Sequence, residues 1–295
     1  MGDARPALDV ALPAASSALP ARLDFLLDDL LPVAVEVCDA AAERTGLVVR
    51  RVHFAAADDR DAARRAIARA LGPDGASVRA VDVPDEDWAA RSQANLRAIR
   101  VGRVVVAPPW NVPGDGEADG CAVVVIEPST GFGTGHHAST RLCLRALQVC
   151  LDGTAAPPDV LDLGTGSGVL AIAAHKLGAA PVVAVDRDAD ALANARVNLA
   201  RNAAGHAVAL RQADVARLAV PGAMVVTANL SGAALVRHAS RIARHVRASG
   251  SLIAGGVTSA EEEQVRAAFD GTLTPAGRET EDGWVALTLR RGSPP

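Results

Sequence analysis

The stretch VLDLGTGSG, residues 160–168, reads as a short buried strand that runs into three closely spaced glycines and then a helix. Glycine lets the backbone turn tightly and approach a ligand, because it has no Cβ to clash. In open α/β sheets, ligands bind at the carboxyl ends of the strands, which is where Gly164, Gly166 and Gly168 fall. Their G-x-G-x-G spacing does not match the pyrophosphate-binding fingerprint of nicotinamide-binding sheets. The segment therefore predicts a ligand site at this strand end, of a different kind from a dinucleotide site.

Four polar residues at strand ends indicate what this ligand is. Asp162 precedes the glycines, where a carboxylate could face a cationic amino-acid moiety through water or backbone amides. Asp186 ends the next strand, where a carboxylate accepts hydrogen bonds from ribose hydroxyls. Asp214 follows a later strand and could contact an adenine amino group, or serve as a turn residue. Asn229 ends the strand after that and could accept a hydrogen bond from an amine. Asp186 and Asn229 could instead cap helices. Together these positions predict an S-adenosylmethionine site.

A second signal precedes the sheet, in residues 126–140, which read IEPSTGFGTGHHAST. Glycines, small hydroxyl side chains and one aromatic residue are typical of a mobile loop that can cover a cofactor. Phe132 is then an apolar cover, although it could simply fill the core. His136 and His137 are adjacent, but no third ligand stands at a spacing typical of metal sites, so no metal is predicted. A histidine general base is a less favoured possibility.

The C-terminal part of the chain alternates between helical and strand-like segments. Alternation of this kind predicts a parallel sheet with both faces covered by helices. The expected helices and strands, in chain order, are 138–151 (helix), 159–163 (strand), 168–177 (helix), 181–186 (strand), 188–202 (helix), 207–211 and 223–228 (strands), 232–247 (helix), 250–255 (strand), 259–269 (helix) and 283–290 (strand). Two further strands, 103–107 and 122–126, are expected to pair ahead of these.

The N-terminal part predicts a separate small domain. Its pattern gives strand 7–12, helix 20–31, strands 33–38 and 47–54, helix 58–71 and strand 77–83. The order βαββαβ favours a ferredoxin-like α+β sandwich. We therefore expect an N-terminal domain over residues 1–83, a linker helix over 84–98, and a catalytic domain over 99–295.

The composition indicates which kinds of partner the chain can bind and in which cellular compartment it is expected. The formal net charge of −4 over 295 residues gives no whole-chain basic field of the kind that drives nucleic-acid binding. The four cysteines form no CxxC pair, which indicates small buried side chains in a reducing compartment. No apolar stretch approaches the ~20 residues that cross a membrane, and no leader pattern begins the chain. We expect a cytoplasmic monomer with no direct contact to nucleic acid or membrane.

Several motifs in a fixed order resemble one family. The segments EPSTGFGTGHHASTRLCLRAL, VLDLGTGSGVLAIAAHKLGA, VAVDRD, ANL and GWVAL, with DEDW and APPW ahead of them, resemble the ribosomal protein L11 methyltransferase (PrmA) family over roughly residues 85–290. The resemblance implies a class I S-adenosylmethionine-dependent methyltransferase, with a seven-stranded Rossmann-like α/β sheet. It also implies that a ferredoxin-like N-terminal domain grips the ribosomal protein, and that a flexible linker lets the catalytic domain reach several amines.

The resemblance adds cofactor-binding positions by motif. It implies Thr140, Gly164, Asp186 and Asn229, with Phe132, Thr134 and Gly135 in the covering loop. The chain departs from the family pattern at Ser92, at Ser139-Thr140 and at Ser231-Gly232, so a different protein or a small molecule stays open as the substrate. Two functions of a different class also stay open, a nicotinamide-dependent oxidoreductase and a non-catalytic ribosome-binding module.

The chemistry that this resemblance implies needs positioning above all. A lysine amine, with a pKa near about 10.4, must be neutral before it can attack a methyl group. Burial beside a sulfonium cation would lower that pKa. We therefore expect no dedicated strong base, and we expect Asn229 and nearby backbone carbonyls to orient the amine of a lysine or of the N-terminus of ribosomal protein L11.

Overall fold

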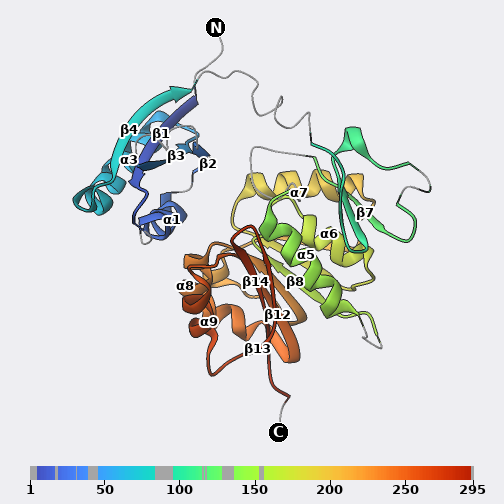
Figure 1. Cartoon of the computed structure of the whole chain (residues 1–295). Helices are drawn as coiled ribbons and strands as arrows, with labels where there is room; N and C mark the ends of the chain where they lie inside the picture. The colour runs from blue at the N-terminus through green and yellow to red at the C-terminus, as the bar shows by residue number, and fades with distance from the viewer. Residues whose placement is uncertain are drawn as a thin grey trace. The chain divides into compact units, whose positions relative to one another are not determined.

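The computed structural model describes residues 5–16, 19–30, 32–38, 46–83, 96–114, 116, 118–127, 136–152 and 156–293. The chain divides into two compact units, Met1–Asn95 and Leu96–Pro295 (Figure 1). The linker helix expected at 84–98 lies outside the described residues up to position 95. Residues 96–98 are described and carry no helix; they precede a strand.

Unit 1 contains a four-stranded antiparallel sheet within its described residues, in the order β2-β3-β1-β4. Leu8, Val10 and Val52 alternate along the strands and pack on the apolar sides of the two helices, for example on Ile67. This βαββαβ arrangement confirms the predicted ferredoxin-like α+β fold. Its elements are β1 (Arg5–Pro13), α1 (Leu19–Leu30), β2 (Ala34–Cys38), β3 (Leu47–His53), α3 (Ala57–Leu71) and β4 (Ser77–Val83).

Unit 2 contains a seven-stranded sheet within its described residues, in the order β10-β9-β8-β11-β12-β14-β13. A smaller sheet, β5-β6-β7, precedes it in the chain. The strands are β5 (Ile99–Val101), β6 (Val104–Ala107), β7 (Ala122–Val125), β8 (Val160–Leu163), β9 (Val182–Asp186), β10 (Val208–Gln212), β11 (Ala223–Asn229), β12 (Val246–Thr258), β13 (Thr274–Glu281) and β14 (Trp284–Arg290). The helices are α5 (Ala138–Leu151), α6 (Val169–Lys176), α7 (Ala189–Arg201), α8 (Gly232–Arg244) and α9 (Glu262–Phe269).

Helices cover both faces of the large sheet, as predicted. Side chains alternate between the faces along each strand, because a strand has a period of two. Val225 and Ile253 belong to the apolar cluster that includes α5 and α6, whereas their neighbours Val226 and Leu252 belong to the cluster that includes α8 and α9. The layered arrangement of Figure 1 therefore rests on two cores, one on each face of the sheet.

Two expectations about the sheet were wrong in part. The sheet is not wholly parallel, because β14 runs antiparallel to both β12 and β13. The segment that forms β13 was not predicted as a strand. Most of its side chains are exposed, and Pro275 and Gly277 flank a register irregularity, so it lacks the apolar alternation that marks a half-buried strand.

Candidate functional site

The glycine turn after β8 has the backbone that its sequence predicts. Gly164, Gly166 and Gly168 all have positive φ angles, of 69°, 53° and 83°. A Cβ on Gly164 would also lie 2.4 Å from Cδ2 of Leu230, the residue after β11. The turn is held to the neighbouring strand, because the Gly164 and Thr165 amides both donate to the Val185 carbonyl at 2.9 Å. Glycine at 164 thus suits the left-handed backbone, and a Cβ there would also displace the Leu230 side chain.

Asp186 reaches this turn from the end of β9. One carboxylate oxygen accepts the Gly166 amide at 2.9 Å, and the other accepts the Asp188 amide at 3.0 Å. These bonds fix the orientation of the carboxylate and leave it further lone pairs, since a carboxylate offers about four acceptor positions. The N-cap of α7 is Asp188, whose side chain accepts from the Asp190 amide. The possibility that Asp186 caps this helix was therefore wrong.

Asp162 lies underneath the turn. Its side chain is only 1% exposed, and its two oxygens accept the Thr165 hydroxyl at 2.6 Å and the Thr227 hydroxyl at 2.5 Å. Thr227 is the register partner of Asp162 in the neighbouring strand β11. Burial raises the pKa of the Asp162 carboxyl above its usual range, while the two hydroxyl groups oppose that shift. In this arrangement Asp162 contacts the inner side of the turn through Thr165.

Asn229 and Thr140, 89 positions apart in the sequence, meet at the carboxyl end of β11. The Asn229 side-chain amide donates to the Thr140 hydroxyl at 3.4 Å, and Thr140 is buried in the first turn of α5. Ser231, not Asn229, caps α8, because its hydroxyl accepts the Ala234 amide at 3.3 Å. The possibility that Asn229 serves as a helix cap was therefore wrong.

A pair of glycines makes room for the Asn229 side chain, and neither was predicted from the sequence. Gly255 is the register partner of Asn229, and the β12–β14 ladder shifts its register at this point. A Cβ on Gly255 or Gly256 would lie 3.1 or 3.2 Å from the Asn229 side-chain oxygen. A Cβ on Gly255 would also lie 2.2 Å from the Cys143 sulfur of α5. The signal was present, because glycines inside a strand often mark a bulge or a close backbone approach.

The remaining predicted site residues fall in different settings. Asp214 caps the short 3₁₀ helix Val215–Arg217, accepting the Ala216 amide at 2.7 Å, which is the turn role that the sequence left open. Its contact with an adenine group stays a prediction. Phe132, Thr134 and Gly135 lie outside the described residues, as does Ser92.

The departure at Ser231-Gly232 has a local explanation. Ser231 supplies the N-cap of α8, and Gly232 leaves space for Glu261, whose carboxylate oxygen lies 2.7 Å from the position of a Cβ on Gly232. Glu261 in turn accepts the Thr258 amide at 2.9 Å and the Thr258 hydroxyl at 2.7 Å. The absence of a side chain at Gly232 thus lets Glu261 pack against the start of α8.

The two adjacent histidines have structural partners. His136 Nε2 lies 2.8 Å from the Arg97 carbonyl. His137 caps α5, because its Nδ1 accepts the Ser139 amide at 3.3 Å, and its ring meets Trp284 edge to face with centroids 4.5 Å apart. The bond from the Ser139 amide needs an unprotonated Nδ1, so the cap favours the neutral form of the His137 imidazole. Burial, with a smaller contribution from Arg141, accordingly lowers the pKa of His137 below its usual value.

The cap at His137 predicts a pH-dependent stability. A depressed folded-state pKa contributes stability that is present above the unfolded value, near 6.5, and is lost as the pH falls through the folded value. We expect the free energy of unfolding of the wild type to fall, between pH 7 and pH 5, by about 1 kcal/mol more than that of His137→Asn, which keeps a capping side chain. Urea unfolding at each pH measures this difference. The exposed His206, replaced by Asn, is the matched control, and equal pH slopes for wild type and His137→Asn would refute the assignment.

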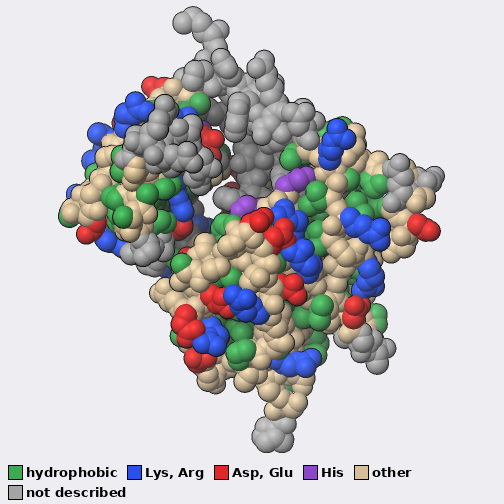
Figure 2. All heavy atoms as spheres, in the orientation of Figure 1, with side chains coloured by type: hydrophobic (Ala, Val, Ile, Leu, Met, Phe, Trp, Pro, Cys, Tyr) green, Lys and Arg blue, Asp and Glu red, His purple; other side chains and the backbone are tan. Residues whose placement is uncertain are grey.

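Charged side chains of both signs join α5 to the β13–β14 hairpin. Arg141 Nε donates to Glu281 at 2.6 Å, and Arg145 also pairs with Glu281. On the face drawn in Figure 2, acidic and basic side chains are mixed and do not form a field of one sign. This end of α5, which carries Thr140, is therefore tied to the hairpin as well as to Asn229.

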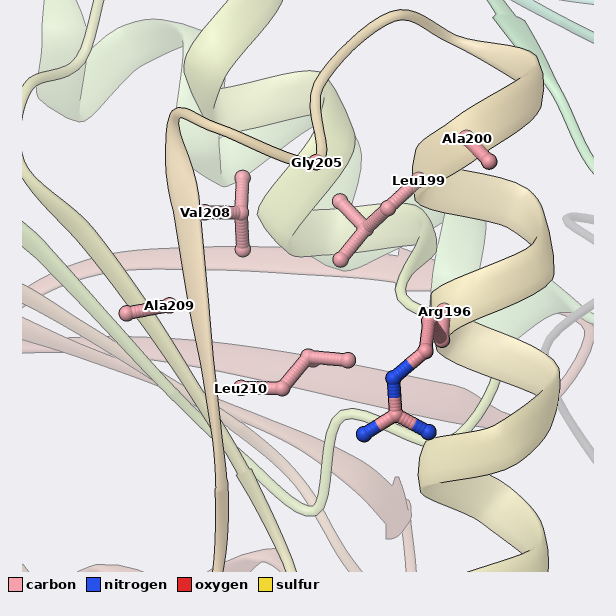
Figure 3. Close-up of a pocket in the computed structure, with 7 residues that line it drawn as sticks. All are labelled: Arg196, Leu199, Ala200, Gly205, Val208, Ala209 and Leu210. Atoms are coloured by element: carbon pink, nitrogen blue, oxygen red, sulfur yellow. The ribbon is translucent and has the colours of Figure 1, made fainter.

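A hollow between α7 and β10 lies apart from these residues. It has a volume of about 390 Å³, and Arg196, Leu199, Val208 and Leu210 are among its lining residues (Figure 3). None of the site residues predicted from the sequence lines it. Among the described residues, no group of three or more His, Cys, Asp or Glu side chains is placed to hold a metal ion. The described part of the chain likewise contains no helix long and apolar enough to cross a membrane.

Comparison with known proteins adds independent information. The family model described as ribosomal protein L11 methyltransferase (PrmA) matches residues 35–292. The chain is 40% identical over 218 residues to the ribosomal protein L11 methyltransferase of Pelobacter propionicus, covering 72% of this chain and 69% of that protein. It is 39% identical over 222 residues to the one from Xylella fastidiosa strain Temecula1, covering 73% and 71%. The solved ribosomal protein L11 methylase of Lactobacillus delbrueckii subsp. bulgaricus superposes with a TM-score of 0.61 at 24% identity, over 67% of this chain and all of that one, which bears on the fold.

Proposed function

The chain belongs to the ribosomal protein L11 methyltransferase (PrmA) family, and on this premise we propose that it methylates lysine side chains, and the N-terminal amine, of ribosomal protein L11. It is an S-adenosylmethionine-dependent protein methyltransferase with a class I Rossmann-like sheet. The observation that carries the proposal is the convergence of Asp186, the glycine turn and Asn229 at one edge of that sheet.

The donors and acceptors at this edge fit S-adenosylmethionine. The Asp186 carboxylate is oriented by two backbone amides and keeps acceptor positions for the two ribose hydroxyls. The turn at Gly164 and Gly166 would lie along the amino-acid end of the cofactor, and Asp214 beside its adenine. Thr140 and Asn229 would complete the wall near the methyl group, with Phe132, Thr134 and Gly135 as further contacts from the loop before α5.

We assign Asp162 a supporting role in this site. Its carboxylate holds Thr165, in the glycine turn, and Thr227, in β11, from below. It would therefore act on the cofactor through the shape of the turn. This assignment keeps the expectation that Asp162 acts on a cationic amino-acid group indirectly, because the side chain is enclosed by its two hydroxyl partners.

Bound S-adenosylmethionine supplies a methyl group that is already activated by its sulfonium. The chain itself then has to hold a neutral amine in line with that group and exclude water. The Asn229 side-chain oxygen would accept a hydrogen bond from the amine, while its amide nitrogen donates to Thr140. The Nδ1 atom of His137 is engaged in capping α5, and we assign His137 no role in proton removal.

Recognition of the protein substrate is proposed for unit 1. Its ferredoxin-like sheet forms a compact unit of its own, and the family premise gives that domain the task of gripping the ribosomal protein. We further propose a cytoplasmic monomer that contacts neither nucleic acid nor membrane directly. The net charge of −4 and the mixed surface charges support the first of these exclusions.

A competition among ribosomal proteins tests the substrate. Ribosomal proteins extracted from large subunits that lack this modification are incubated with the enzyme and S-adenosylmethionine radiolabelled in its methyl group. We expect the label to appear on L11 alone after separation of the proteins. Label on another protein would keep the methyltransferase activity and reject L11 as the substrate, and no label on any protein would reject both.

A further inference from the structure

The free edge of β7 is hydrogen-bonded by side chains where a fourth strand would otherwise lie. β7 is the last strand in the order β5-β6-β7, so one side of it has no strand partner in the described sheet. At Val123 the carbonyl accepts Lys176 Nζ of α6 at 2.6 Å. At Val125 both backbone groups bond to Asn202, the C-cap residue of α7. The Val125 amide donates to the Asn202 side-chain oxygen at 2.9 Å, and the Val125 carbonyl accepts from the Asn202 side-chain nitrogen at 2.6 Å.

The series continues at Glu127, the next residue on the same edge. Its backbone amide donates to the Asn198 side-chain oxygen at 2.8 Å, and its carboxylate pairs with Arg201. The match between helix and strand is geometric. Four helical residues, from Asn198 to Asn202, advance about 6 Å, and two extended residues advance about 6.6 Å. The side-chain amides of Asn198, in the last turn of α7, and of Asn202, at its C-cap, can therefore meet two residues of the strand edge that point the same way.

Asn198 differs from Asn202 in what its second group binds. The Asn198 side-chain nitrogen donates to the Ser167 carbonyl, in the glycine turn, at 2.9 Å. Asn198 and Ser167 are both buried, with the Asn198 side chain fully so. One amide thus joins Glu127, at the end of the β7 segment, to the turn that carries Gly166 and Gly168. Asp186 holds the same turn one residue earlier, through the Gly166 amide.

Only a side chain with one donor and one acceptor of this size suits the place of Asn198. An aspartate would present an acceptor to the Ser167 carbonyl, and an apolar residue would lose the bonds to both the Glu127 amide and the Ser167 carbonyl. The position of Asn202 also needs one donor and one acceptor, but both of its bonds go to the backbone of Val125 and neither goes to the glycine turn. The two asparagines are therefore a natural pair for comparison.

We propose that Asn198 is a positioning residue for the cofactor, which sets the glycine turn against the end of the β7 segment, whereas Asn202 serves stability alone. This inference rests on the proposed function, since it takes the glycine turn as part of the S-adenosylmethionine site. Loss of the Asn198 bonds releases the Ser167 carbonyl, and the turn then no longer holds the backbone shape that the cofactor needs.

The test compares Asn198→Ala with Asn202→Ala in the full-length protein. Each variant loses two hydrogen bonds to other segments, so we expect similar falls in melting temperature. We expect Asn198→Ala to raise the Kd for S-adenosylhomocysteine about tenfold, measured by titration calorimetry. We expect the Kd of Asn202→Ala for S-adenosylhomocysteine to stay within about twofold of the wild-type value. For Asn198→Ala, we expect a larger change in the KM for S-adenosylmethionine than in kcat at saturating S-adenosylmethionine.

The possible outcomes separate the inference from the function on which it rests. Equal changes in Kd for the two variants would overturn the positioning role and leave the proposed function intact. A wild type that does not bind S-adenosylhomocysteine would overturn both. If Asn198→Ala does not fold, Asn198→Ser replaces it, because it keeps an uncharged polar group in the buried site but is too short to join Glu127 to Ser167. A wild-type Kd for that variant would equally overturn the inference.

Discussion

Replacing Asp186 by alanine should weaken the binding of S-adenosylhomocysteine about a hundredfold. The carboxylate is held by the Gly166 and Asp188 amides at 2.9 and 3.0 Å, and it would accept both ribose hydroxyls. Hydrogen bonds to an ionised group contribute about 1.5–3 kcal/mol each, so the loss of this acceptor is large. The same substitution frees the Gly166 amide and loosens the turn. Titration calorimetry with S-adenosylhomocysteine measures the effect.

Asp188 provides the matched control for Asp186. It lies two residues further on and caps α7 through the Asp190 amide, so Asp188→Ala removes a neighbouring carboxylate and lowers helix stability. Its backbone amide, which contacts Asp186, is kept. We expect an affinity close to that of the wild type for Asp188→Ala. If the two alanine variants lose affinity to the same extent, Asp186 acts through local stability and not as a ligand of the cofactor.

Replacing Asn229 by alanine should slow catalysis and leave the affinity for the cofactor nearly unchanged. We expect kcat to fall by about a hundredfold, because an error of about 1 Å in the position of a reacting group costs on that order. The Kd for S-adenosylhomocysteine should stay within about threefold of the wild-type value, since Asp186 and the glycine turn are unchanged. The two quantities are obtained from a methyl-transfer assay on L11 and from calorimetry on the same preparation.

Gln212 offers a control for Asn229 on the same sheet. Its amide also stands at the carboxyl end of a strand, β10, and donates to the Arg187 carbonyl at 3.3 Å. We expect Gln212→Ala to keep the wild-type kcat. Unchanged turnover in Asn229→Ala would remove Asn229 from the mechanism, and a large rise in Kd would make it a cofactor ligand only.

Patterns within one segment were readable from the sequence. The predicted bounds of α5 match the structure, because its apolar positions recur at helical spacing and a polar residue stands just before it. The glycine turn and the place of Asp186 at a strand end were also predictable. The sequence shows a buried strand that runs into glycines, followed by a strand that ends in a carboxylate. These features depend on neighbours in the chain, and the position of strand ends at one sheet edge follows from parallel topology.

Features that depend on distant partners were not readable. The amides of Asn198 and Asn202 look like ordinary polar helix positions, and only the fold brings them against Glu127 and Val125, 71 and 77 positions away. Thr227 likewise becomes a partner of Asp162 through strand register. The strand β13 escaped notice because its polar, mostly exposed side chains carry no period, and β14 alone makes it a strand.

Methyl transfer from this sheet edge to amines of L11 is tested by the intact mass of purified L11 after incubation with the enzyme and S-adenosylmethionine, followed by peptide mapping. We expect mass increases of whole methyl groups that map to lysine side chains or to the N-terminal amine. With Asn229→Ala they should accumulate about a hundredfold more slowly. An unchanged mass of L11, under conditions where calorimetry shows the cofactor bound, would contradict methyl transfer to L11.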